Sequence, residues 1–74
     1  VEHGASAVDF HFDAPHADIR HQAAAVLRSG FPGIGIYTDW RWHGRRLPIG
    51  FHVDQRTRPQ VWRRVDGHYV YLLP

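Results

Sequence analysis

Residues 49–54 read IGFHVD and alternate apolar with polar side chains from Phe51 onward. A period of two residues is typical of a β-strand that packs one face on a core and leaves the other face for polar groups. We therefore expect a strand here, with Phe51 and Val53 on its buried face. His52 and Asp54 would then share the opposite face.

Residues 7–13, AVDFHFD, show the same alternation. Phe10 and Phe12 fall on one side of this predicted strand. Asp9 and His11 fall on the other side. Each of the two strands thus carries a carboxylate and an imidazole, two residues apart, on the face without phenylalanine. If the strands lie side by side, these polar groups converge on one point; otherwise they form a solvated strand face with incidental histidines.

The chain has seven histidines and no cysteine, which excludes thiolate metal sites and disulfide scaffolds. Imidazole is the commonest metal ligand in proteins. Nitrogen and oxygen ligands that converge in a partly closed site suit Zn²⁺ held by three protein groups and a water. Such an ion polarises a carbonyl group and activates water for attack on it.

A helix is expected between the two histidine-bearing strands. Residues 13–15, Asp-Ala-Pro, form a helix-start signal, because proline is tolerated in the first turn. The apolar residues that follow at helical spacing are Ile19, Ala23, Val26 and Leu27. Gly30 and Pro32 predict that this helix ends near Ser29.

The rest of the chain reads mainly as strands. Residues 33–37, GIGIY, predict a strand in which glycine marks the close approach of a ligand or another backbone. Residues 38–48, rich in arginine and tryptophan, are expected to form a polar loop or excursion. Residues 61–65 and 68–73 predict a last strand pair, joined at Asp66-Gly67, the strongest hairpin signal in the chain. Together these elements predict an α+β fold, with one helix packed on a small, mainly antiparallel sheet.

The length and composition limit the size of the domain and the classes of partner that it can bind. A chain of 74 residues forms one domain with a thin core, since this length buries only roughly 60% of its unfolded surface. No apolar run approaches the ~20 residues that a membrane-spanning helix needs. The net charge of +2, with every basic residue an arginine, permits an anionic partner without requiring one.

Four segments resemble a known family when they are taken in order. Residues 2–10, EHGASAVDF, resemble the S-x-H-x-x-G-x-A-x-D signature of the zinc D-Ala-D-Ala carboxypeptidases, the LAS or hedgehog-like metallopeptidases. Residues 33–37 and 50–54 are similar to the family's Gly-Val-Gly-Tyr-Tyr-like strand and its Phe-Val-His-Val-Asp segment. Residues 58–62 are similar to its Arg-x-Trp stretch. Each motif alone is weak, whereas four in the same order are specific.

The resemblance implies that His3, Asp9 and His52 coordinate zinc in a hedgehog/DD-peptidase-like fold. It implies a bacterial hydrolase, periplasmic or secreted, that cleaves peptide bonds in the stem peptides of peptidoglycan in the cell wall. It also implies that residues 1–74 are the C-terminal, metal-binding part of a larger peptidase domain. The missing N-terminal part, with the family's substrate-binding arginine, would precede Val1.

Two positions depart from the family pattern. His3 and Asp9 are six positions apart, one fewer than usual, so His11 is an alternative ligand. The family's catalytic acid, three residues before the last histidine ligand, falls on Ile49 here. Asp54 is the nearest substitute, either as the general base or as a partner that orients the imidazole of His52.

The remaining hypotheses concern the substrate and the class of protein. Tyr37 is a candidate for a substrate-binding hydroxyl, or else a packing residue. Ile49 at the acid position favours a catalytically silent relative that acts as a binding or structural module. The tryptophans and arginines of residues 40–46 and 62–64 support a third, less favoured hypothesis, a nucleic-acid-binding module.

Overall fold

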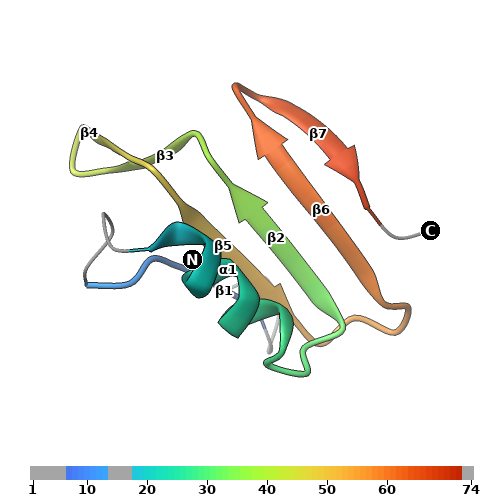
Figure 1. Cartoon of the computed structure of the whole chain (residues 1–74). Coiled ribbons are helices and arrows are strands. Elements are labelled where there is room, and N and C mark those ends of the chain that lie inside the picture. Colours follow the sequence, from blue (N-terminus) through green and yellow to red (C-terminus); the bar gives the residue numbers. More distant parts are fainter. Residues whose placement is uncertain (1–6, 14–17, 73–74) are drawn as a thin grey trace.

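In the computed structural model, the described residues are 7–13 and 18–72. Within them the chain forms one helix and seven strands (Figure 1). In chain order these are β1 (Ala7–Phe10), α1 (Ile19–Leu27), β2 (Gly33–Tyr37), β3 (Trp40–Trp42), β4 (Arg45–Leu47), β5 (Gly50–Asp54), β6 (Gln60–Val65) and β7 (His68–Tyr71). The predicted α+β class is confirmed.

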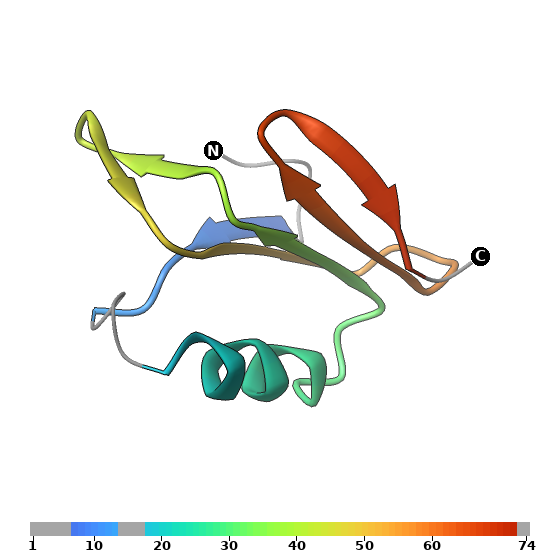
Figure 2. The same cartoon turned by 45° about the horizontal axis from the view of Figure 1, so that its top comes forward.

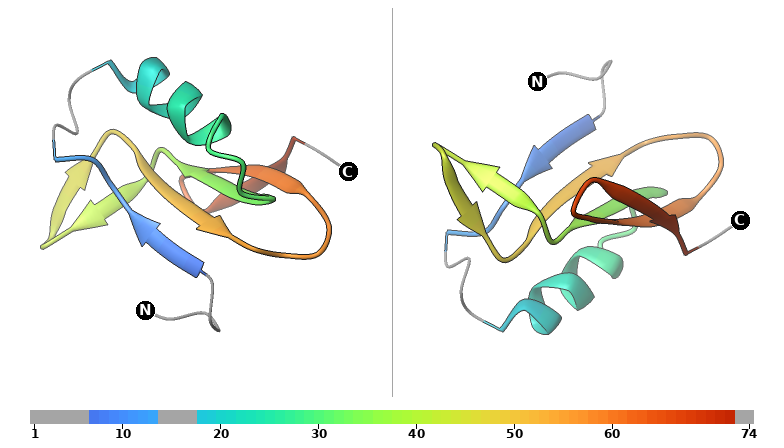
Figure 3. Two further views of the ribbon diagram at one scale, coloured as in Figure 1. Left: turned by 90° about the horizontal axis from the view of Figure 1, so that it is seen from below. Right: turned by 90° about the horizontal axis from the view of Figure 1, so that it is seen from above.

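Five of the strands form one sheet in the order β1-β5-β2-β6-β7. Every neighbouring pair is antiparallel except β2 and β6, which run parallel, so the sheet is mainly antiparallel as predicted. Helix α1 lies against one face of this sheet (Figure 2). The β3–β4 and β6–β7 hairpins lie at opposite sides of the molecule (Figures 2 and 3). The face away from α1 is therefore flanked by two hairpins.

The core lies between α1 and the sheet. The period-two pattern explains which strand residues belong to it. Phe51 has no exposed surface, and Val53 and Ile34 are buried beside it together with Val26 of the helix. The ring of Phe10 packs on that of Phe51, with centroids 5.6 Å apart. The predicted buried face of residues 49–54 is thus confirmed.

The helix begins later and ends earlier than the sequence indicates. Its N-cap is Asp18, whose carboxylate accepts hydrogen bonds from the backbone N–H groups of Arg20 and His21. The predicted start at residues 13–15 is therefore wrong, because Asp18 satisfies the N–H groups of the first turn; residues 14–17 lie outside the described residues. The helix ends at Leu27, two residues before Ser29, whose N–H and hydroxyl both bond to the carbonyl of Val26.

Several strand boundaries and the structure of one predicted loop also differ from the prediction. Strand β1 ends at Phe10 rather than at residue 13, because its pairing with β5 stops there. Strand β7 ends at Tyr71. Residues 38–48 do not form a plain loop, since β3 and β4 pair as a hairpin. Its turn is formed by His43 and Gly44, both with positive φ, which suits the twist of a tight hairpin.

The Asp66-Gly67 hairpin turn is confirmed, and both residues have positive φ, at 49° and 80°. No helix in the described part of the chain has the length and hydropathy of a membrane-spanning segment.

Candidate functional site

The side chains of Asp9 and His52 meet on the sheet face opposite α1. The two residues are direct partners in the antiparallel register of β1 and β5. Although they are 43 positions apart in the chain, Nδ1 of His52 lies 2.6 Å from Oδ1 of Asp9. The predicted convergence of the two polar strand faces is confirmed for this pair.

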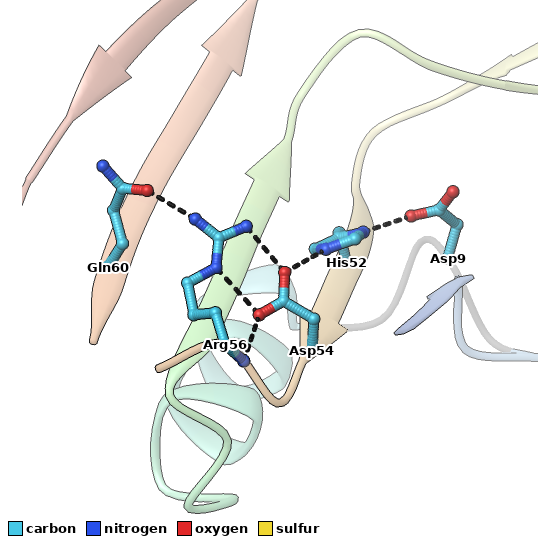
Figure 4. A network of polar contacts seen from close by, with 5 residues as sticks. All are labelled: Asp9, His52, Asp54, Arg56 and Gln60. Carbon is cyan, nitrogen blue, oxygen red and sulfur yellow. Dashed lines mark hydrogen bonds and ion pairs between the residues drawn. The ribbon is translucent and has the colours of Figure 1, made fainter. Parts of the chain in front are cut away.

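His52 also contacts a second carboxylate. Its Nε2 lies 2.7 Å from Oδ2 of Asp54, on the same strand (Figure 4). Carboxylates thus lie against both ring nitrogens of His52, and the tautomer decides which nitrogen donates. A cation bound between Asp9 and Nδ1 would displace a proton from this contact, since metal binding releases protons from its ligands.

Asp54 is held by Arg56, which lies just beyond the end of β5. The Nε and backbone N–H groups of Arg56 donate to Oδ1 of Asp54 at 2.8 and 3.1 Å, and Nη2 donates to Oδ2 at 2.6 Å. Hydrogen bonds from Arg56 hold the pKa of Asp54 far below its usual range; burial opposes this effect, and the bond to His52 adds to it. Nη1 of Arg56 donates in turn to Oε1 of Gln60 on β6. The imidazole is thus oriented by a chain of polar contacts that crosses the sheet (Figure 4).

Gly33 and Gly35 of β2 lie directly beneath the side chains of this part of the sheet. A Cβ atom on Gly33 would lie 1.8 Å from Oδ1 of Asp54, and one on Gly35 would lie 2.7 Å from the indole of Trp62. The glycine pattern predicted the close approach of a ligand or another backbone, whereas side chains of Asp54 and Trp62 make this approach in the structure. Only hydrogen fits at these positions, which keeps Asp54 and Trp62 flat against the sheet.

A pocket of about 230 Å³ lies beside His52 on this face. We call it the aromatic pocket; it is lined by Tyr37, His52, Arg56, Gln60, Trp62, Tyr69 and Tyr71. The candidate substrate-binding Tyr37 is one of these residues. Its ring is stacked on Trp40 and lies under the guanidinium of Arg64. Burial raises the pKa of the Tyr37 hydroxyl, against the opposing effect of a hydrogen bond with Trp62.

The remaining predicted ligands are His3 and its alternative, His11. His3 lies outside the described residues. Nδ1 of His11 accepts a hydrogen bond from Nε1 of Trp40 at 3.3 Å, and its ring packs edge-on against Trp42. Within residues 7–13 and 18–72, no group of three or more metal-ligating side chains is placed to hold an ion. His11 contacts Trp40 and Trp42, and its role as an alternative ligand stays a prediction.

The donor set of this site suits zinc in part. One imidazole nitrogen and one carboxylate oxygen are ligands that Zn²⁺ prefers, and Asp54 on the other ring nitrogen matches the carboxylate that commonly orients a ligating histidine. The 2.6 Å separation of Nδ1 and Oδ1 is that of a direct hydrogen bond. Two ligands on one tetrahedral zinc lie roughly 3.3 Å apart, so the side chains must separate slightly to admit an ion.

Sequence reasoning did not single out Arg56 or Gln60, although a signal for Arg56 was present. Residues 52, 54 and 56 have the same parity, so an extended chain carries them on one face. The sequence offered Trp62, together with nearby arginines, as support for a nucleic-acid-binding surface. In the structure its side chain is buried beneath Arg56, whose Cζ lies 4.5 Å from the centroid of the indole ring.

Neither a protein-family model nor a curated protein nor a solved structure matches this chain. The functional assignment therefore rests on the motifs and on the geometry of the site.

Proposed function

We propose that this chain is the metal-binding part of a zinc peptidase of the D-Ala-D-Ala carboxypeptidase type, with a hedgehog/DD-peptidase-like fold. Its substrates are peptidoglycan stem peptides, and its location is periplasmic or secreted. The contact between Asp9 and His52 carries the proposal, because the motif resemblance requires these two distant residues to share an ion and they lie 2.6 Å apart.

In this proposal Asp9 and His52 would hold the zinc ion, with His3 as the third ligand that the resemblance implies. The ion would supply polarisation of the scissile carbonyl and activation of water. The protein contributes the orientation of the ligands: Asp54 fixes one ring nitrogen of His52, so that the other faces Asp9. Tyr37, in the adjoining pocket, is the residue proposed to contact the substrate.

For Asp54, we favour the orienting role over that of general base. Both of its oxygens accept hydrogen bonds from Arg56, and one also contacts His52. A general base needs a pKa near the working pH, whereas these contacts lower the pKa of Asp54. Ile49, at the family's acid position, is buried in the core with 3% of its surface exposed, and its side chain has no group that could carry a proton. This placement of Ile49 supports the alternative of a catalytically silent relative.

The purified protein is expected to contain about one zinc ion per chain, as a site of this class requires. It is expected to release D-alanine from an N-acylated peptide that ends in D-Ala-D-Ala. Metal analysis and an assay for free D-alanine measure the two properties. Zinc without hydrolysis identifies the silent relative, and a protein that binds no zinc contradicts both forms of the proposal.

The substitution Asp54→Asn separates the two roles of this carboxylate. If Asp54 orients His52, zinc affinity falls by about 10- to 100-fold and hydrolysis recovers when zinc is saturating. If Asp54 is the base, hydrolysis stays lost at saturating zinc while the affinity is unchanged. Competition with a chelator gives the affinity, and Asp66→Asn, an exposed turn residue, is the matched control.

A further inference from the structure

Strand β7 forms one edge of the five-stranded sheet, next to β6 (Figure 1). Within residues 7–13 and 18–72, no strand pairs with the other side of β7. All of its residues, from His68 to Tyr71, are exposed, and so is Leu72, which follows it. The free side of β7 is therefore a place where backbone hydrogen-bonding groups can accept a further strand.

The pairing with β6 shows which backbone groups of β7 point outward. In an antiparallel pair, successive residues alternately direct their N–H and C=O groups toward the partner strand and away from it. The N–H of Leu72 donates to the carbonyl of Val61 at 2.7 Å, so Leu72 faces β6. Val70, two residues earlier, faces β6 as well. The backbone groups of Tyr69 and Tyr71 consequently point to the free side.

The free side of β7 lacks the features with which proteins usually block such an edge. These features are charged side chains, proline and β-bulges. Residues 68–72, HYVYL, contain no proline, lysine, arginine or acidic residue, and the register of β7 with β6 runs without a bulge. At the opposite edge of the sheet, by contrast, β1 carries the carboxylate of Asp9. The β7 edge is thus suited to pairing with another chain.

The side chains along this edge determine which strand fits beside it. Tyr69 and Tyr71 lie on the face of the aromatic pocket, whereas Val70 and Leu72 lie on the opposite face. Each of the four keeps between 43% and 60% of its surface exposed. A strand that covers them needs apolar side chains on both of its faces. A second copy of β7 has them.

A second copy of β7 also fits the backbone groups. Antiparallel pairing about a two-fold axis at Val70 places Tyr69 of each copy opposite Tyr71 of the other. Each of these two pairs then exchanges both of its N–H···O=C bonds. Val70 meets the partner subunit's Val70, and His68 meets the partner subunit's Leu72. No two like charges face each other in this register, and two-fold symmetry is the commonest symmetry of protein dimers.

We propose that this chain forms a two-fold dimer in which β7 pairs antiparallel with β7 of a second copy, centred on Val70, so that the two five-stranded sheets become one continuous sheet. The partner subunit's Tyr71 then lies beside Tyr69, which lines the aromatic pocket, so each subunit extends the wall of the other's pocket. The dimer goes beyond the proposed function and depends neither on zinc binding nor on hydrolysis.

Cysteine cross-linking tests this register directly, because the chain has no cysteine of its own. Opposed residues in a non-hydrogen-bonded pair have Cα atoms about 4.5 Å apart, which is within the range of a disulfide. Val70→Cys is therefore expected to give a covalent dimer with oxidised glutathione, measured by non-reducing gel electrophoresis. His68→Cys is the matched control, since the two copies of this residue are offset by roughly 13 Å along the strands. It is expected to remain largely monomeric on the gel.

The substitution Val70→Lys places two like charges at the two-fold axis. It is expected to raise the dissociation constant of the dimer by about tenfold or more, through repulsion and lost apolar burial. Val8→Lys is the matched control, because Val8 is an exposed valine on β1, at the opposite edge of the sheet. Sedimentation velocity at several protein concentrations measures the dissociation constants, and circular dichroism checks that both variants fold.

Three results would each overturn the proposal. They are a chain that stays monomeric even at millimolar concentration, cross-linking of His68→Cys as efficient as that of Val70→Cys, and equal weakening of the dimer by Val70→Lys and Val8→Lys. If Val70→Lys does not fold, the two cysteine variants still decide between this register and any other.

Discussion

Replacement of His52 by alanine is expected to abolish zinc binding while the protein remains folded. His52 connects the carboxylates of Asp9 and Asp54, and it provides a nitrogen ligand of the proposed site. Loss of an outer partner of a metal ligand already costs about 10- to 100-fold in affinity, so loss of the ligand itself is expected to cost at least about 100-fold. Metal analysis after dialysis measures this loss.

The fold is expected to tolerate this substitution because the side chain of His52 lies on the face away from the core. Asp54 keeps its hydrogen bonds to Arg56, and Asp9, with 32% of its side chain exposed, can be hydrated. His68→Ala is the control, since His68 is exposed on β7. A zinc content that is unchanged in His52→Ala would exclude His52 from the site.

Phe51→Ala is expected to produce the largest loss of stability in the chain. Phe51 has no exposed surface and packs against the rings of Phe10 and Phe12, with centroids 5.6 and 5.7 Å away. Truncation of a buried phenylalanine to alanine costs about 3–5 kcal/mol, through lost burial and the cavity left behind. A chain of 74 residues has a small free energy of unfolding, so this variant is expected to be largely unfolded at 25 °C.

Urea denaturation followed by circular dichroism measures this effect. Phe12→Ala is the matched control, because Phe12 contacts the same ring but keeps 38% of its surface exposed. Its loss of stability is expected to be well under that of Phe51→Ala. Similar losses for the two variants would show that Phe51 is not the centre of the core.

The network at His52 joins the candidate metal ligands to the β5–β6 connection. Arg56 bridges Asp54 to Gln60, so one side chain joins the end of β5 to the start of β6. Arg64 plays a comparable part nearby, where it donates to Asp39 and covers Tyr37. Arg64 belongs to the residues on which the nucleic-acid hypothesis was based, and its ion pair with Asp39 within the protein weakens that hypothesis.

Local pattern determined the strands and their faces. The period-two alternation of residues 33–37 and 49–54 predicted both strands within one residue of their bounds and assigned Phe51 and Val53 to the core. The Asp66-Gly67 turn followed from the preference of those residues for positive φ. Such features depend on neighbours in the chain, so the sequence alone contains them.

Long-range packing decided the rest. The alternation at Asp9 and His52 shows which face each residue occupies, but only the register of β1 on β5 makes the two residues direct partners. The parallel pairing of β2 with β6 brings Gln60 and Trp62 beside the site. Register and strand order are set by the fit of whole faces against the core and against each other, and no segment of the sequence contains that information by itself. The motifs therefore identified the candidate ligands, whereas the aromatic pocket and the Arg56 network became visible only in the folded chain.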